Sequence, residues 1–189
     1  MHRSAHVDTF SRDNLPPRDQ LPAFLDSPDT RYPARMNAAV ELLDAMIERG
    51  HGHSIALIND DAACTWLQLR AQVDRIAQVL TGPMGLVPGN RVLLRGGNNP
   101  MMAACWLATV KAGLVAVATM PLLRAVELTQ IAEKAQVNAV LCDLKLREEV
   151  DIGARQCALL RNARFFNDGS DAADSLEAQF ARVDRPFKA

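Results

Sequence analysis

RVLLRGGNNPMMAACWLATVKAGLVAVATMPLLRAVEL, residues 91–128, is the stretch that decides the fold. Two apolar runs in it, at 91–95 and 114–119, have the length and composition of strands that are covered on both faces, as in parallel sheets. The residues between the runs, roughly a dozen, suffice for one crossover helix. The stretch therefore predicts a buried βαβ unit.

The helix between the two runs has recognisable ends. Asn98 or Asn99 can cap its start, and Pro100 suits the first helical position. Gly113 suits the left-handed residue that closes a helix. The middle of the helix, at 101–108, is apolar on every side, so we expect it to be buried all round.

Further elements are expected on both sides of this unit. Upstream, the periodicity predicts a helix at 37–49, a hairpin at 54–65 and a helix that ends near Leu80, with Thr65 and Gln68 as its capping box. Downstream it predicts, in order, a helical stripe at 128–135, a strand at 138–142, a charged helix at 143–150, a strand at 163–166 and a last helix at 171–183. The order predicts an α/β fold: a doubly wound, mainly parallel sheet with flanking helices and an N-terminal hairpin.

The helix before residue 81 has two distinct faces in the sequence. One is apolar and is expected to be buried: Leu69, Val73, Ile76 and Leu80. The other is polar and is interpreted as a solvated surface: Arg70, Asp74, Arg75 and Gln78.

The first part of the chain differs in composition from the rest. Residues 1–35 carry half of the ten prolines and no sustained periodicity, which predicts an extended Pro-rich arm. Apolar anchors favour an arm that lies over the body: Phe10, Leu15, Leu21, Phe24, Leu25 and Tyr32. Residues 36–185 form the predicted α/β domain, and residues 186–189 a truncated tail.

Composition excludes several classes of partner. A formal net charge of −1 gives no electrostatic case for binding nucleic acid or an anionic membrane. No apolar run reaches the roughly 18 residues of a membrane span. The four cysteines show no CxxC spacing and are interpreted as small buried residues, which indicates a cytoplasmic protein. His51 and His53 lack a third ligand in a recognisable pattern, so no metal site is expected.

Two loops follow strands and are therefore the candidate ligand-binding loops. In the first, at 96–99, Asn98 and Asn99 are expected to line a cleft; the loop is either an anion cradle at a helix start or a tight turn with an asparagine cap. In the second, Pro121 is expected to line the cleft, and Arg124 either reaches a phosphate or carboxylate or is a surface residue.

Catalytic motifs are missing from the sequence. There is no Walker loop, no GxSxG, no HExxH and no convincing pair of carboxylates. Residue chemistry alone therefore predicts a ligand-associated or structural α/β domain. Two such readings remain open: a stand-alone nucleotide-binding module that uses residues 96–99, and a non-catalytic interaction domain.

Three segments in order resemble landmarks of the AMP-forming acyl-CoA ligases. TWLQLRAQVDRIAQVL (65–80) is similar to their "TY-x-EL" element, and GLVPGNRVLL (85–94) to "G-x-x-x-GD-x-V", with Asn90 in place of the usual aspartate. WLATVKAGLVAVATMPLLRAVEL (106–128) is similar to "KAG-x-x-x-x-P-x-x-P". Within the family, residues 95–113 and 119–136 look most like the benzoate and 2-aminobenzoate (anthranilate) CoA ligases, and residues 37–50 agree with this aryl branch.

The resemblance implies a two-step chemistry for a parent enzyme. A small aromatic acid, ATP and Mg²⁺ would give acyl-AMP and pyrophosphate, and CoA would then displace AMP. The family's Ser/Thr/Gly-rich loop with lysine does not occur here. The resemblance therefore implies an amino-terminal fragment that is inactive alone, binds no cofactor tightly and lacks its downstream subdomains. By the same resemblance, Arg124 would contact a CoA phosphate.

Overall fold

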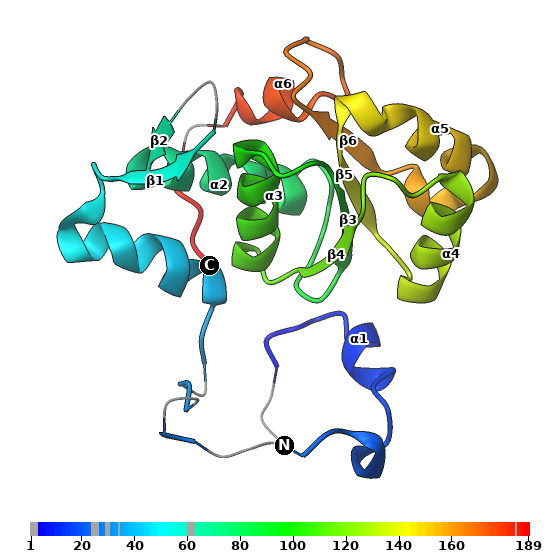
Figure 1. The fold of residues 1–189 in the computed structure, drawn as a ribbon, viewed down its shortest axis with the longest axis horizontal. Coiled ribbons are helices and arrows are strands. Elements are labelled where there is room, and N and C mark those ends of the chain that lie inside the picture. The colour runs from blue at the N-terminus through cyan, green and yellow to red at the C-terminus, as the bar shows by residue number, and fades with distance from the viewer. Residues whose placement is uncertain (1–3, 24–26, 29–30, 34, 60–62, 184) are drawn as a thin grey trace.

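The computed structural model describes residues 4–23, 27–28, 31–33, 35–59, 63–183 and 185–189. Its centre is a four-stranded parallel sheet in the order β4-β3-β5-β6 (Figure 1). The strands are β3 (Arg91–Arg95), β4 (Val115–Thr119), β5 (Ala139–Asp143) and β6 (Ala163–Phe166). Every residue of the two central strands, β3 and β5, is buried, as their uninterrupted apolar runs predict.

Helices cover both faces of this sheet. The crossovers contain α3 (Pro100–Lys111), α4 (Ala125–Ala135) and α5 (Arg147–Gln156). The strand order reverses at β3, because β4 lies on one side of it and β5 on the other. Right-handed crossovers then place α3 on one face and α4 and α5 on the opposite face, as Figure 1 shows. The predicted doubly wound α/β fold is confirmed.

Two hydrophobic clusters fill the space between the layers. Val92 and Leu94 point to the face covered by α2 (Trp66–Thr81) and α3. Leu93 points to the face of α4 and α5. Successive side chains of β3 therefore point to opposite faces of the sheet, as they do in any β-strand.

The ends of α3 agree with the sequence, but its middle does not. Asn99 caps the helix, since its side-chain oxygen accepts from the Met102 N–H at 2.9 Å. Gly113 adopts the left-handed conformation, with φ of 71°. The prediction that the helix is buried all round is wrong at Trp106, which is exposed.

The predicted hairpin and the helix after it are present. β1 (Ile55–Ile58) and β2 (Ala63–Thr65) pair antiparallel, and the capping box of Thr65 and Gln68 starts α2. Residues 60 and 61 of the predicted turn lie outside the described residues. The apolar face of α2 is buried as predicted.

The interpretation of Asp74 as a solvated surface residue is wrong. Asp74 is buried and pairs with Lys111 of α3 at 2.7 Å. Asp44 pairs with the same ammonium group at 2.8 Å. A charged residue next to an apolar stripe is ambiguous in the sequence, because only the packing of α2 against α3 decides which side it faces.

The helix predicted at 37–49 is wound more widely than an α-helix. It contains two π-helical segments, η3 (Val40–Asp44) and η4 (Ile47–His51). The side-chain amide of Asn37 donates to the Lys111 carbonyl at 3.0 Å, and its oxygen accepts from the Ala39 N–H at 3.0 Å. One asparagine thus joins the start of this helix to the end of α3.

The remaining elements lie between β5 and the C-terminal end. The helix predicted at 143–150 is a 3-10 turn, η5 (Leu144–Leu146), followed by α5. The turn η6 (Ala158–Leu160) precedes β6. The last helix, α6 (Leu176–Phe180), is shorter than predicted, with Leu176 buried inward. Within the described residues, no helix is long and apolar enough to cross a membrane.

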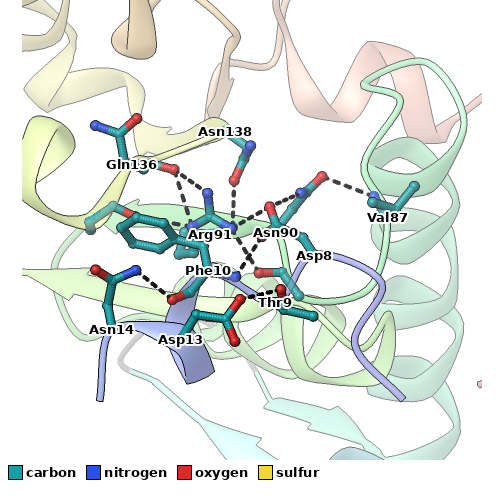
Figure 2. Close-up of polar contacts among 12 residues, drawn as sticks. Asp8, Thr9, Phe10, Asp13, Asn14, Val87, Asn90, Arg91, Gln136 and Asn138 are labelled. Carbon is teal, nitrogen blue, oxygen red and sulfur yellow. Dashed lines mark hydrogen bonds and ion pairs between the residues drawn. The ribbon is translucent and has the colours of Figure 1, made fainter. Parts of the chain in front are cut away.

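The amino-terminal arm is anchored to the edge of the sheet where the strands begin. It contains α1 (Phe10–Asp13) and η1 (Arg18–Gln20). The carboxylate of Asp8 pairs with Arg91 at 2.5 Å, and the Phe10 ring lies 4.7 Å from the Arg91 guanidinium carbon (Figure 2). Of the predicted apolar anchors, Phe10 is confirmed, whereas Leu15 and Tyr32 are exposed; Phe24 and Leu25 lie outside the described residues.

Candidate functional site

The edge formed by the carboxyl ends of the strands holds the candidate site. β3 and β5 are neighbours in the sheet. The chain passes from β3 into α3 on one face, and from β5 into α5 on the opposite face. In open α/β sheets, ligands bind in the crevice that such a reversal opens. Loop 96–99 follows β3, Asp143 ends β5, and Asn167 follows β6.

Asp143 joins these three loops. Its Oδ2 accepts from the side-chain amides of Asn99 at 3.2 Å and Asn167 at 2.8 Å, and its Oδ1 accepts from the Lys145 N–H at 3.1 Å. The residue is only 5% exposed, and these three donors satisfy its two oxygens. The sequence reasoning missed Asp143; the available signal was a carboxylate at the carboxyl end of an apolar strand.

Loop 96–99 is a tight, capped turn, which is one of the two interpretations left open by the sequence. The Asn99 oxygen already occupies the position at the start of α3 where an anion would accept from the Met102 N–H. Gly96 packs against Phe166, so closely that a Cβ would lie 2.8 Å from the ring. The conformation of the loop is therefore explained by the asparagine cap and by the packing of Gly96, and the loop is not an open anion-binding site.

A pocket of about 360 Å³ opens between the end of β1 and the start of α3. Its walls combine apolar side chains with asparagines: Leu57, Ile58, Asn59, Asn98, Asn99, Pro100, Met102, Ala103 and Trp106. The structure thus places the predicted Asn98 and Asn99 at a pocket. Pro121 is not part of its lining and lies in the other loop.

A buried arginine holds that second loop, which we define as residues 120–124. Arg95, at the end of β3, donates to the carbonyls of Met120 at 3.1 Å, Pro121 at 3.0 Å and Leu123 at 2.7 Å. Its side chain is 1% exposed. Arg95 was not singled out from the sequence, although a cation that ends an apolar strand run is an unusual feature.

Arg124 lies at the start of α4, on the same edge. Its side chain is 76% exposed, and its Nε pairs with Glu149 of α5 at 2.9 Å. The other oxygen of Glu149 accepts from the Ala125 N–H at 2.7 Å, and Glu127 accepts from the Arg124 N–H at 3.0 Å. In the described part of the chain, no hydrogen bond or ion pair joins Arg124 to Asn98 or Asn99.

Other chemistry at this edge is limited. Burial raises the pKa of the Cys142 thiol to about 12, against an opposing influence of Arg95, so the thiol stays protonated. Among the described residues, no group of three or more His, Cys, Asp or Glu side chains could hold a metal ion. The arrangement offers amides, one exposed guanidinium and an apolar wall.

Comparison with known proteins assigns this architecture to a family. The model of the family described as AMP-binding enzyme matches residues 45–184, which is well over half of the chain. The chain belongs to this family. The match begins within the helix at 38–51 and runs through α6, so both candidate loops of the chain lie inside it.

Individual relatives are acyl- and aryl-CoA ligases. A human mitochondrial medium-chain acyl-CoA ligase is 26% identical over 113 residues, which cover 59% of this chain and 18% of that protein. The benzoate–CoA ligase of Thauera aromatica is 30% identical over 96 residues, covering 51% and 18% respectively. A crystal structure of the anthranilate CoA ligase AuaEII in complex with anthranoyl-AMP has the same fold, with a TM-score of 0.69 at 18% identity, covering 80% of this chain and 28% of that one.

These matches confirm the resemblance to the AMP-forming ligases and to a benzoate–CoA ligase, whereas the likeness to the anthranilate enzyme is one of fold. They also show its extent, because the chain aligns with less than a fifth of the length of the two sequence relatives. The roles of Asn98, Asn99, Pro121 and Arg124 stay predictions.

Proposed function

We propose that this chain forms the amino-terminal part of an ATP-dependent CoA ligase for small aromatic acids. The observation that carries the proposal is the match to a benzoate–CoA ligase inside a family match that spans most of the chain. The reaction would join benzoate or 2-aminobenzoate to CoA through an acyl-AMP intermediate, with Mg²⁺ assisting and with AMP and pyrophosphate as products. The free cysteines fit a cytoplasmic location.

The described residues would contribute one wall of the ligand cleft. Asn98 and Asn99 offer amide groups beside an apolar pocket, and Pro121 belongs to the loop that Arg95 holds. Arg124 would bind a phosphate of CoA. Its high exposure supports this role.

The reacting groups would be supplied outside these 189 residues. Attack of a carboxylate on the α-phosphate of ATP needs cations and N–H donors aimed at the developing negative charge. The family's loop of Ser, Thr and Gly with a lysine is absent from the sequence. We therefore expect the 189-residue chain to bind no cofactor tightly and to be inactive without downstream subdomains.

The substrate proposal is tested with the product of the whole reading frame in which this sequence lies. Purified protein is incubated with ATP, Mg²⁺, CoA and one acid at a time, and thioesters are measured by mass spectrometry. We expect benzoyl-CoA and 2-aminobenzoyl-CoA, with little product from octanoate. A preference for octanoate would contradict the aromatic substrate and favour the medium-chain class of the human relative.

The role of Arg124 is tested in the same protein by Arg124→Ala. We expect the apparent KM for CoA to rise about tenfold, the typical value of one charge-assisted hydrogen bond, while ATP–pyrophosphate exchange is unchanged. Arg155→Ala, which removes an exposed arginine from α5, is the matched control. An unchanged KM for CoA in Arg124→Ala would refute the assignment.

A further inference from the structure

We propose that Arg95 is a positioning residue, which fixes the shape of loop 120–124 and thereby the place of Arg124. An effect of Arg95 on CoA binding rests on the proposed function, whereas its effect on the shape of the loop rests on the geometry alone. No motif marks Arg95, and it does not itself reach the exposed side of the loop, since its side chain is 1% exposed.

The sheet brings Arg95 to the loop. In the parallel pairing of β3 with β4, Arg95 lies opposite Thr119, the last residue of β4. The loop that follows β4 therefore begins at the level of the arginine. Alternation along β3 places the side chain on the same face as Leu93, which is the face of α4. The guanidinium group thus lies between the end of β3 and the start of α4.

The contacts of Arg95 are made with a single loop. Its two terminal nitrogens donate to three carbonyls of residues 120–123, at 2.7 to 3.1 Å. No carboxylate of the described residues forms an ion pair with it, and its Nε has no hydrogen-bond partner among them. A buried cation is costly unless polar groups compensate it. Here the carbonyl groups of the loop compensate the buried charge. The loop conformation therefore stabilises the guanidinium group, and the guanidinium group stabilises the loop conformation.

Arg91, at the other end of the same strand, shows the contrast. It pairs with the carboxylate of Asp8 and donates to the carbonyls of Ala135 and Gln136 at the end of α4. Arg91 and Asp8 therefore form an ordinary structural ion pair, in which opposite charges compensate each other. Arg95 has no such partner among the described residues, and its contacts set backbone geometry only.

The loop held in this way presents its side chains to solvent. Leu122 is 81% exposed and Arg124 is 76% exposed. Glu127 and Glu149 accept hydrogen bonds from the backbone where α4 begins, so the loop is fixed at its far end as well. A fixed loop with an exposed apolar group and an exposed cation loses little conformational entropy on binding a ligand. This is the property that Arg95 supplies.

The first test follows the loop itself in the purified chain. Arg95→Met removes the donors, and Arg95→Lys keeps a charge that cannot contact three carbonyls in a forked geometry. Hydrogen exchange is measured at the amides of Leu123 and Ala125, which are hydrogen-bonded in the structure. We expect exchange there to quicken about tenfold or more in Arg95→Met and less in Arg95→Lys.

A control separates this effect from general destabilisation. Leu80→Ala creates a cavity in the buried face of α2, on the other side of the sheet, and should lower stability without loosening the loop selectively. Selective quickening in the Arg95 variants supports the proposal. Exchange at Leu123 and Ala125 that is unchanged, or that quickens as much in Leu80→Ala, would overturn it.

The second test uses the product of the whole reading frame. We expect Arg95→Met to raise the apparent KM for CoA as Arg124→Ala does, with ATP–pyrophosphate exchange unchanged. If Arg124→Ala raises this KM and Arg95→Met does not, the positioning role is refuted. If neither variant changes it, the CoA assignment of the proposed function fails, and hydrogen exchange alone decides the role of Arg95.

Discussion

At position 90 an asparagine stands where the resembled ligases usually carry aspartate, and the structure supplies a physical reason. The Asn90 amide nitrogen donates to the carboxylate of Asp8 at 2.8 Å, while its oxygen accepts from the Val87 N–H at 3.0 Å (Figure 2). An amide can donate to one of these groups and accept from the other, whereas an ionised carboxylate can only accept. An aspartate here would face the carboxylate of the arm.

This geometry predicts the effect of Asn90→Asp. The change removes the donor and brings two carboxylates together, so we expect the free energy of unfolding at pH 7 to fall by about 1–3 kcal/mol in urea titrations. Asp8→Asn also loses the ion pair with Arg91, so the test is a double-mutant cycle: Asn90→Asp and Asp8→Asn together should cost less than the sum of their separate losses, because an amide again faces a carboxylate. Losses that simply add would disprove the pairing.

The arm also predicts a dependence of stability on pH. The Phe10 N–H and the Arg91 guanidinium donate to Asp8 and hold the pKa of its carboxyl below the ordinary value of 3.8. A carboxyl whose pKa is lowered on folding contributes stability above its unfolded pKa and loses it as pH falls through the folded value.

Asp8→Asn is the variant that measures this contribution. We expect it to be less stable than the wild type at pH 7, with the difference shrinking below about pH 4 as Asp8 becomes protonated. Urea unfolding across the acid range gives the comparison. A difference that does not shrink as the pH falls below the ordinary pKa of 3.8 would count against an ionised, hydrogen-bonded Asp8.

At the scale of elements, Lys111 joins three helices that the sequence presents as separate. The residue is 3% exposed, and its ammonium group pairs with Asp44 of η3 and Asp74 of α2. The lysine belongs to the KAG landmark of the resembled family, and in this structure its role is to join elements. A buried pair that loses one partner leaves an uncompensated charge.

Lys111→Met should therefore lower the free energy of unfolding by about 3–5 kcal/mol. Thermal and urea unfolding measure the loss. Lys134→Met, at an exposed position of α4, is the control and should change stability by about 0.5 kcal/mol or less. A loss in Lys111→Met no larger than in the control would show that the buried pairs do not contribute.

Most elements of the fold could be predicted from the sequence because their signals are local. The asparagine cap, Pro100 and Gly113 define α3, and uninterrupted apolar runs define β3 and β5. The π-helical winding near 40–51 could not be predicted in this way, since it depends on how that helix packs.

The candidate site was predicted less completely, for a physical reason. Asn98 and Asn99 do lie at a pocket. Asp143 and Arg95, however, act through partners far away in the sequence, in loops that only the strand order brings together. Asp74 was misassigned for the same reason, because its partner Lys111 is on another helix.

At the scale of the whole molecule, the chain is one doubly wound sheet with an arm anchored where its strands begin and candidate loops where they end (Figure 1). The arm contacts at Asp8 and the loop contacts at Arg95 lie at opposite ends of β3. Changes to the arm should therefore affect stability, whereas changes to the loops should affect ligands. This separation supports a chain that supplies a scaffold and one wall of a cleft.

We propose that these 189 residues form part of a ligase site and that its reacting groups lie outside them. The most direct test is ATP–pyrophosphate exchange by the purified 189-residue chain with benzoate and 2-aminobenzoate, beside the product of the whole reading frame. We predict no exchange above background for the chain and clear exchange for the whole product. Appreciable exchange by the 189-residue chain alone would contradict the account.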